Sequence, residues 1–287
     1  MLKMALIPDI VTDWFVSRGW VPRRHQREMI EAADEGRHAL LVASTGAGKT
    51  LAGFLPTLGE LIADPTDGLH TLYISPLKAL AVDVRRTLLI PIEEMGLPIR
   101  VEARTGDTPS DRKQRQRVNP PHILLTTPES LSLLLSHEDS LLMFSTLKRV
   151  IVDEVHAFAN GKRGDLLSLS FARLQTLSPN MQRVALSATV ADPDDYRAWL
   201  APDGDIDLVR LVEGEAAAEP DLTILLPEGR VPWAGHSGQH AIPQLIEEIG
   251  RNKITLIFCN TRFLAEYIFQ KLWDANEPKY AIGIHHG

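Results

Sequence analysis

The sequence predicts an α/β fold in which a parallel sheet is covered by helices on both faces. Short β-branched apolar runs alternate with helical patterns up to residue 187, and this alternation is typical of parallel strands joined by right-handed crossovers. The runs are apolar at nearly every position, as strands covered on both sides are. A glycine-rich turn, Ala43–Thr50, lies between the first run and the helical pattern after it, which gives the order strand, tight turn and helix.

The expected strands and helices of the first lobe follow from these runs. Strands are predicted over Ala39–Ala43, Thr71–Ser75, His122–Thr126, Arg149–Asp153 and Arg183–Ser187. Helices are predicted over Leu77–Ile90 and Leu131–Leu135. The first lobe is expected to span residues 1–205.

The pattern changes after the turn cluster at Ala201–Asp205. Residues 206–221 are predicted to be a linker, with an acidic connector at Gly214–Pro220. Residues 222–287 are expected to form a partial second α/β lobe. Its strands are predicted at Leu222–Leu226, Ile254–Cys259 and Tyr280–Ile284, and its helices near Pro243–Gly250 and Phe263–Asn276.

Composition narrows the class of protein. The chain has 287 residues, 44% of them hydrophobic, and a formal net charge of −7, which argues against a uniformly basic coat for nucleic acid but leaves a local basic groove open. The one cysteine, Cys259, allows no disulfide within the chain and indicates a reducing compartment, the cytoplasm. Neither a signal peptide nor a membrane span is expected, because the apolar start ends at Pro8-Asp9 and no run reaches the ~20 apolar residues of a span.

The turn Ala43–Thr50 is predicted to bind phosphate. Such a turn points successive backbone N–H groups into one concavity at the positive end of a helix dipole. Lys49 would place a positive charge on the β- and γ-phosphates, and Thr50 a hydroxyl on Mg²⁺. A plain glycine turn between core elements is the alternative. The nucleotide-contact residues expected here are Thr45, Gly46, Ala47, Gly48, Lys49 and Thr50.

A second pattern, Val150–His156, leads from an apolar strand into two carboxylates. Ligand sites of open α/β sheets lie at the carboxyl ends of the strands. Asp153 is expected to hold Mg²⁺ and Glu154 to orient and deprotonate an attacking water. His156 is expected to sense the γ-phosphate. A solvated acidic turn is the alternative for this stretch alone.

Two further stretches support a nucleotide site. Ser187, Ala188 and Thr189 follow a buried strand, where small hydroxyls can hydrogen-bond across to the carboxylate turn and couple it to other segments. Upstream of the phosphate turn, the amide of Gln26 can donate to and accept from an adenine edge, and Arg23 can lie over the ring. A helix start with a proline in its first turn is the alternative for this second stretch.

Together these stretches resemble superfamily 2 helicases of the DEXH-box type. The matching segments are Ala43–Thr50 (phosphate loop), Asp153–His156 (D-E-x-H box), Ser187–Thr189 (S-A-T motif) and Gln26 (adenine-reading glutamine). The chain is also similar to the large helicase-related family, and within it to the ligase-associated DEXH-box DNA helicases. The segments that carry this likeness are Trp20–Gln26, Pro232–His236 and Ile284–Gly287.

The resemblance implies P-loop NTPase chemistry in RecA-like lobes, with ATP and Mg²⁺ as cofactors. It also implies that the chain is cut short within the second lobe, before the arginine finger. It assigns nucleic-acid contacts to residues that follow strands: Pro76, Leu77, Lys78, Thr105, Gly106, Thr127, Pro128, Asn260, Thr261 and Arg262. The stretch Arg104–Val118 adds five basic residues against two acidic ones, although a solvated helix face is an equal alternative there.

The function expected from the resemblance is an ATP-dependent helicase or translocase that tracks single-stranded DNA in DNA repair, with repair proteins as partners. An RNA helicase and an ATP-gated binding fragment without efficient turnover are the alternatives.

Overall fold

The computed structural model describes residues 7–158, 161–215, 221–227 and 238–286. The chain folds into two compact units, Met1–Ala217 and Ala218–Gly287, and the architecture of each is given by itself. The predicted motif at residues 232–236 and residues 216–220 of the predicted acidic connector lie outside the described residues.

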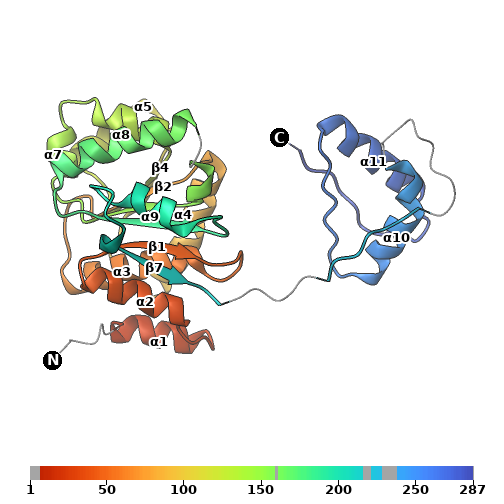
Figure 1. The fold of residues 1–287 in the computed structure, drawn as a ribbon, viewed down its shortest axis with the longest axis horizontal. Coiled ribbons are helices and arrows are strands. Elements are labelled where there is room, and N and C mark those ends of the chain that lie inside the picture. Colours follow the sequence, from red (N-terminus) through yellow and green to blue (C-terminus); the bar gives the residue numbers. More distant parts are fainter. Residues whose placement is uncertain (1–6, 159–160, 216–220, 228–237, 287) are drawn as a thin grey trace. The chain divides into compact units, whose positions relative to one another are not determined.

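The first unit is built on a seven-stranded parallel sheet with the order β3-β4-β2-β5-β6-β1-β7 (Figure 1). The strands are β1 (His38–Val42), β2 (Thr71–Ile74), β3 (Val101–Arg104), β4 (Ile123–Thr126), β5 (Arg149–Val152), β6 (Gln182–Ser187) and β7 (Val209–Glu213). The five predicted strands of the first lobe are confirmed to within one residue at either end.

The helices cover both faces of this sheet, as predicted. One face carries α1 (Asp9–Ser17), α2 (Arg24–Asp34), α3 (Lys49–Ala63) and α4 (Lys78–Glu94), and the other carries α6 (Pro128–Leu135), α7 (Ser140–Phe144), α8 (Lys162–Leu177) and α9 (Pro193–Leu200). Neighbouring strand residues point to opposite cores: Leu41 packs with the first set of helices and Leu40 with the second. This alternation explains why the central strands are apolar throughout.

The predicted linker is wrong over its first half. The backbone of β7 pairs with β1 along its whole length, with His38 opposite Val209 and Val42 opposite Glu213. Residues 209–213 therefore belong to the first sheet, and the turn at Ala201–Asp205 is a loop within the first unit. Turn-rich sequence marked a change of direction here, and the change leads back into the same sheet.

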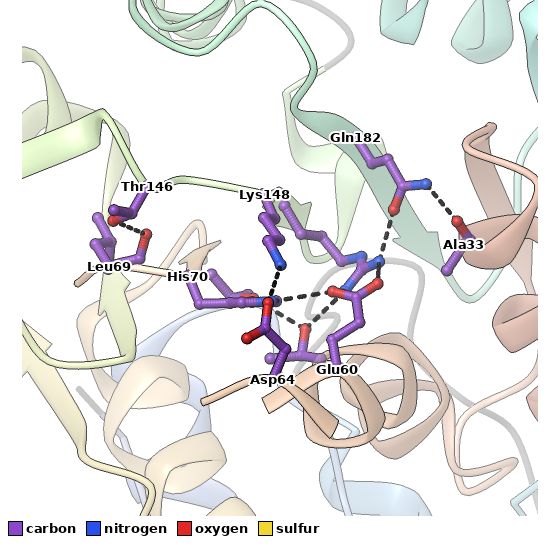
Figure 2. A network of polar contacts seen from close by, with 11 residues as sticks. Ala33, Glu60, Asp64, Leu69, His70, Thr146, Lys148 and Gln182 are labelled. Atoms are coloured by element: carbon purple, nitrogen blue, oxygen red, sulfur yellow. Dashed lines mark hydrogen bonds and ion pairs between the residues drawn. The ribbon is translucent and has the colours of Figure 1, made fainter. Parts of the chain in front are cut away.

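The amino ends of the strands are joined by a buried polar network (Figure 2). Arg149 opens β5 and is only 1% exposed. Its guanidinium donates to Glu60 Oε1 at 2.7 Å and to Gln182 Oε1 at 2.6 Å. Glu60 Oε2 also lies 3.0 Å from His70 Nε2, and Gln182 in turn donates to the carbonyl of Ala33 at 2.7 Å. These bonds tie α2 and α3 to strand ends at one edge of the sheet.

The second unit contains η3 (Gln239–Ala241), α10 (Ile242–Arg251) and α11 (Arg262–Asp274), so both predicted helices are confirmed. The three predicted strands are wrong in this structure: none of the described residues of the unit is assigned to a strand. Their side chains are largely exposed, with Leu222 at 86% and Phe258 at 90%. An apolar run shows that a segment suits a sheet, but a strand also needs a neighbour whose backbone pairs with it.

Among the described residues, no helix combines the length and the apolar composition that crossing a bilayer requires.

Candidate nucleotide and nucleic-acid sites

The predicted nucleotide residues meet at the carboxyl edge of the first sheet. β6 lies between β1 and β5 and pairs with both. The phosphate turn follows β1 and the carboxylate turn follows β5, so their backbones leave the sheet about 10 Å apart, which is two strand spacings. The serine that ends β6 lies between them. Sites of open parallel sheets occupy this kind of position.

The phosphate turn has the conformation that anion binding needs. Gly46 and Gly48 have φ of 81° and 77°, values that favour glycine because no Cβ is present. Gly48 leads directly into α3, a helix of 15 residues, so the turn lies at a positive helix end. Lys49 is 8% exposed, and its Nζ donates to the carbonyl of Ser44 at 3.3 Å. The amine is therefore folded into the turn where phosphate would lie.

Close packing fixes α3 beneath the turn. A Cβ on Gly53 would lie 3.2 Å from Leu186 Cδ1 and 3.6 Å from Ile151 Cγ2. The helix therefore crosses β5 and β6 at close range, and its amino end lies at the phosphate turn. Glycine at this position lets the backbone of α3 approach the sheet.

Asp153 is held by two donors. Its Oδ1 accepts from the backbone N–H of Glu154 at 2.9 Å, and its Oδ2 accepts from the hydroxyl of Tyr73. The carboxylate is 7% exposed. Each oxygen keeps a free lone pair, so Asp153 together with the hydroxyl of Thr50 supplies the oxygen ligands that Mg²⁺ prefers beside phosphate and water. The donor set fits the metal.

The backbone at Glu154 is strained. Its φ of 48° and ψ of 49° lie in the left-handed region, which is unusual for a residue other than glycine and is found at functional sites. The conformation turns the chain from β5 into the short helix η1 (Val155–Ala157). The Glu154 side chain stays 32% exposed, so it remains open to water at the sheet edge.

The serine of the third motif contacts the carboxylate turn. Ser187 Oγ lies 2.9 Å from His156 Nδ1 and also donates to the carbonyl of Thr189 at 2.9 Å. His156 Nδ1 is 3.5 Å from Glu154 Oε2. The structure thus brings Ser187, Thr189, Glu154 and His156 into one chain of polar contacts. The coupling role of Ser187, Ala188 and Thr189 stays a prediction.

A cavity of about 390 Å³ beside the phosphate turn suits a purine ring. Its lining residues are Phe15, Trp20, Val21, Arg23, Gln26, Gly46, Gly48 and Leu51. Gln26 Oε1 accepts from the backbone N–H of Arg23 at 2.9 Å, so this amide caps its own helix. Its Nε2 faces Gly48, where a Cβ would lie 3.1 Å away. Both predicted roles of this stretch, helix start and base contact, are therefore compatible.

Sequence reasoning missed the aromatic wall of this cavity. Phe15 and Trp20 come from α1 and from the segment after it. Trp20 is 50% exposed, and its ring meets that of Trp14 edge to face at 5.7 Å. A tryptophan six residues before Gln26 was the available signal, because aromatic rings offer a stacking face to bases.

The predicted nucleic-acid residues of the first unit follow β2, β3 and β4, which are neighbours in the sheet. Leu77 is 58% exposed. Lys78 forms an ion pair with Asp107 at 2.9 Å. Thr105 and Thr127 are 8% and 5% exposed, and the Thr127 hydroxyl accepts from the N–H of Ser130 as the cap of α6. The carboxyl edge of the sheet is thus divided. The predicted nucleotide-binding residues follow β1, β5 and β6, and the predicted nucleic-acid contacts follow β2, β3 and β4.

Arg163 links the two halves of this edge. It lies in α8, downstream of the carboxylate turn. Its guanidinium donates to the carbonyl of Pro76 at 2.8 Å and to Glu129 Oε1 at 2.6 Å. It also lies 5.6 Å from the ring centre of Phe158. One side chain therefore contacts the loop after β2, helix α6 after β4 and the segment after β5.

Three of the predicted nucleic-acid contacts lie in the second unit: Asn260, Thr261 and Arg262. Thr261 Oγ1 accepts from the N–H of Leu264 at 3.1 Å and caps α11. Within the described part of the chain Arg262 has no ion pair. These residues are near one another in the second unit, and their role stays a prediction.

Comparison with known proteins shows the class of protein. The profile of the DEAD/DEAH box helicases matches residues 23–196, a range that holds both nucleotide turns and the loops after β2, β3 and β4. The chain belongs to this DEAD/DEAH box helicase family.

Individual relatives are Lhr-type helicases. The Lhr helicase/probable uracil glycosylase of Mycolicibacterium smegmatis is 36% identical over 97% of this chain and 19% of its own length. The ATP-dependent helicase Lhr-Core protein 2 of Thermococcus barophilus is 37% identical over 98% and 35%. The chain therefore spans about a fifth to a third of the length of such relatives. The narrower likeness to ligase-associated helicases stays a prediction.

Solved structures agree with this fold. The structure of Mycobacterium smegmatis helicase Lhr bound to ssDNA and AMP-PNP matches 95% of this chain and 36% of its own, with a TM-score of 0.79 and 36% identity. The helicase MrfA bound to DNA and AMPPNP matches 97% of this chain and 39% of its own, with a TM-score of 0.79. At 24% identity this second match concerns the fold alone. The predicted α/β, RecA-like class is confirmed.

Proposed function

We propose that this chain is the ATP-binding core of a helicase or translocase that acts on single-stranded DNA. The observation that carries the proposal is the convergence of Lys49, Thr50, Asp153 and Glu154 on either side of β6. A family relative is described bound to ssDNA and AMP-PNP, which favours DNA over RNA as the strand. The glycosylase in the name of the Mycolicibacterium smegmatis relative supports a setting in DNA repair, since glycosylases act on bases in DNA.

In the proposed reaction the triphosphate of ATP lies in the turn that precedes α3. Its phosphate oxygens accept from the backbone N–H groups of the turn and from Lys49. Thr50 and Asp153 would hold Mg²⁺, which when bound would neutralise charge on the phosphate oxygens. Glu154 orients and deprotonates the attacking water. The base stacks near Trp20 and receives a hydrogen bond from Gln26 Nε2.

We further propose a cytoplasmic location and DNA-repair proteins as partners. The lone cysteine, Cys259, is a free thiol in the structure, in keeping with a reducing compartment. The proposed domain arrangement is an ATP-binding lobe that includes β7, followed by a partial second RecA-like lobe from residue 222.

The test is the rate of ATP hydrolysis with and without single-stranded DNA. Glu154→Gln is expected to lower kcat by about 10²- to 10⁴-fold, because it removes the general base, while leaving ATP-analogue binding intact. Lys49→Ala is expected to abolish that binding as well. If the wild-type chain hydrolyses ATP no faster than both variants, the enzymatic proposal is wrong and an ATP-gated binding fragment remains. Competition between DNA and RNA strands of one sequence decides the substrate, and preference for RNA would contradict the DNA assignment.

A further inference from the structure

The basic residues of α5 (Ser110–Val118) fall into two sets with different surroundings. Arg112 and Arg115 form ion pairs with Glu102 of β3, at 3.2 Å and 2.7 Å. Burial alone would raise the pKa of Glu102, but hydrogen bonds from Gln116 and Arg112 outweigh it and lower that pKa. The carboxylate therefore stays ionised, and both arginines are ion-paired with it within the protein.

The other set lines a cavity of about 400 Å³ on the opposite side of α5. The lining residues are Arg104, Thr105, Gly106, Ser110, Lys113, Gln114, Arg117, Ser130, Leu133 and His137. Three of these side chains are cationic, and none is a carboxylate. Hydroxyl and amide groups make up most of the remaining polar lining. The cavity opens at the carboxyl ends of β3 and β4, beside the predicted strand contacts Thr105 and Gly106.

Arg104 is the buried cation of this cavity. It is 4% exposed, and one guanidinium nitrogen donates to the carbonyl of Lys113 at 2.7 Å. No acidic side chain lies within ion-pair distance of it in the described part of the chain. Burial first, and then the charge of Arg117, lower the pKa of Arg104 to about 10, so it remains a cation at neutral pH.

Arg117 is only partly satisfied by its surroundings. Its Nε is buried and makes no hydrogen bond to any residue that the structure describes. That nitrogen forms an ion pair with Asp139 Oδ2 at 3.5 Å, and the Asp139 side chain is 56% exposed. A second guanidinium nitrogen is 3.2 Å from His137 Nε2, and a histidine ring does not neutralise an arginine. Three cations, Arg104, Lys113 and Arg117, thus line one cavity, and among the described residues one exposed carboxylate, Asp139, is paired with them.

Such an arrangement is costly unless an anion enters. A buried cation loses hydration, and a second cation nearby adds repulsion. An anion with several acceptor oxygens removes both penalties and can accept from guanidinium, ammonium and hydroxyl donors together. A backbone phosphate of a nucleic-acid strand has this chemistry, and the neighbouring loops are those assigned to the strand.

We propose that this cavity, the Arg104 cavity, binds a backbone phosphate of the single strand through Arg104, Lys113 and Arg117. The inference rests on the proposed function and deepens it, since it names which basic residues grip the strand. It also explains how a chain with a net charge of −7 binds a polyanion. The three cations of the cavity outnumber the carboxylates paired with them in the described part of the chain, where Asp139 pairs with Arg117.

The test measures binding of the 287-residue chain to a fluorescein-labelled oligothymidylate by anisotropy over a series of NaCl concentrations, with AMP-PNP present. Arg117→Gln is expected to raise Kd about tenfold, the cost of one charge-assisted contact. It should also lower the slope of log K against log [salt] by about 0.7, the value for one phosphate on a single strand. Lys113→Gln is expected to act in the same direction.

Arg115→Gln is the matched control, because it removes the same charge from the same helix but from the set paired with Glu102. It is expected to leave the salt slope unchanged. Equal effects of Arg115→Gln and Arg117→Gln would show that only net charge counts, and would overturn the cavity assignment. Thermal melting of each variant shows whether it is folded, and Arg104→Lys tests the buried position with its charge kept: its folded form should bind more weakly, since lysine lacks the planar fork.

Two further outcomes separate the inference from the proposed function. If the wild-type chain binds no strand at all, both fail together. If inorganic phosphate raises the Tm of the wild type but not of Arg117→Gln, while that variant binds the strand normally, the cavity takes free anions and only the inference is overturned.

Discussion

Asp153 depends on a residue that no motif contains. Tyr73 of β2 is fully buried and donates its hydroxyl to Asp153 Oδ2, while its ring stacks on Phe54 of α3 with centroids 5.3 Å apart. Burial, followed by the charge of Asp153, raises the pKa of the phenol above its ordinary value, so the hydroxyl stays protonated and remains a donor. The core side of the sheet therefore orients the predicted metal ligand.

Tyr73→Phe should keep the stacking and remove only this donor. The free energy of unfolding is expected to fall by about 1–2 kcal/mol, since the lost hydrogen bond has a charged acceptor. The Mg²⁺ concentration for half-maximal ATP hydrolysis is expected to rise, because Asp153 is less well oriented. Urea denaturation and a magnesium titration measure the two effects. Tyr196→Phe in α9 is the control, since the Tyr196 hydroxyl has no hydrogen bond among the described residues, and an equal loss there would contradict the argument.

At the scale of elements, a strand could be predicted from the sequence when both of its faces are buried. The central strands are buried on both faces, so their apolar runs were visible. The two missed strands, β3 and β7, are the edges of the sheet. Polar residues such as Glu102 and Arg210 interrupt their patterns, as partial exposure allows. Pairing in the second unit was over-predicted for the opposite reason, because apolar character was present there without a paired neighbour.

Two glycines of α3 should respond differently to alanine. A Cβ on Gly59 would touch only Pro8, at 3.7 Å, so Gly59→Ala is expected to stabilise the protein by about 0.5–1 kcal/mol through helix propensity. A Cβ on Gly53 would meet Leu186 at 3.2 Å, so Gly53→Ala should stabilise less. Chemical denaturation of the two variants gives the comparison. A larger gain at Gly53 would mean that α3 is not held against the sheet as described.

At the scale of the whole molecule, stability is expected to fall in acid because several histidines are buried in the neutral form. The clearest shift is at His38, which is partly buried and whose Nδ1 accepts from the backbone N–H of Arg183 at 3.0 Å. Burial, and then the charge of Arg183, lower its pKa from 6.5 to about 4. The unfolded chain thus binds the proton more readily. The contribution of His38 is fully present above pH 6.5 and is lost as pH falls from 6.5 to about 4.

This linkage predicts that the free energy of unfolding drops by up to about 3 kcal/mol over that interval on account of His38. His38→Asn, which keeps an acceptor but does not titrate, should flatten the dependence between pH 6.5 and about 4. Denaturation curves at half-unit steps measure it. His240→Asn serves as the control because its imidazole is exposed, and it should leave the slope unchanged; a slope that survives His38→Asn would assign the effect to other groups.

The site could be predicted from the sequence only where the residues that act together are also close together in the chain. Turns that follow strands, such as Ala43–Thr50 and Asp153–His156, were found because each is local. Contacts between distant segments left no local trace: the wall from Phe15 and Trp20, the donor on Tyr73, and the division of charges along α5. Folding sets these contacts through the order of the strands, which the sequence does not state.

That order has one more consequence. On the proposed function, the loops after β1, β5 and β6 bind ATP, and the loops after β2, β3 and β4 bind the nucleic acid. In the sheet, the two groups of loops adjoin only where β2 pairs with β5. A conformational change that passes through the sheet from one group of loops to the other must therefore cross this border, which the contacts of Arg163 bridge. Variants that hydrolyse ATP without translocating should therefore carry substitutions clustered along this border and not scattered over the molecule.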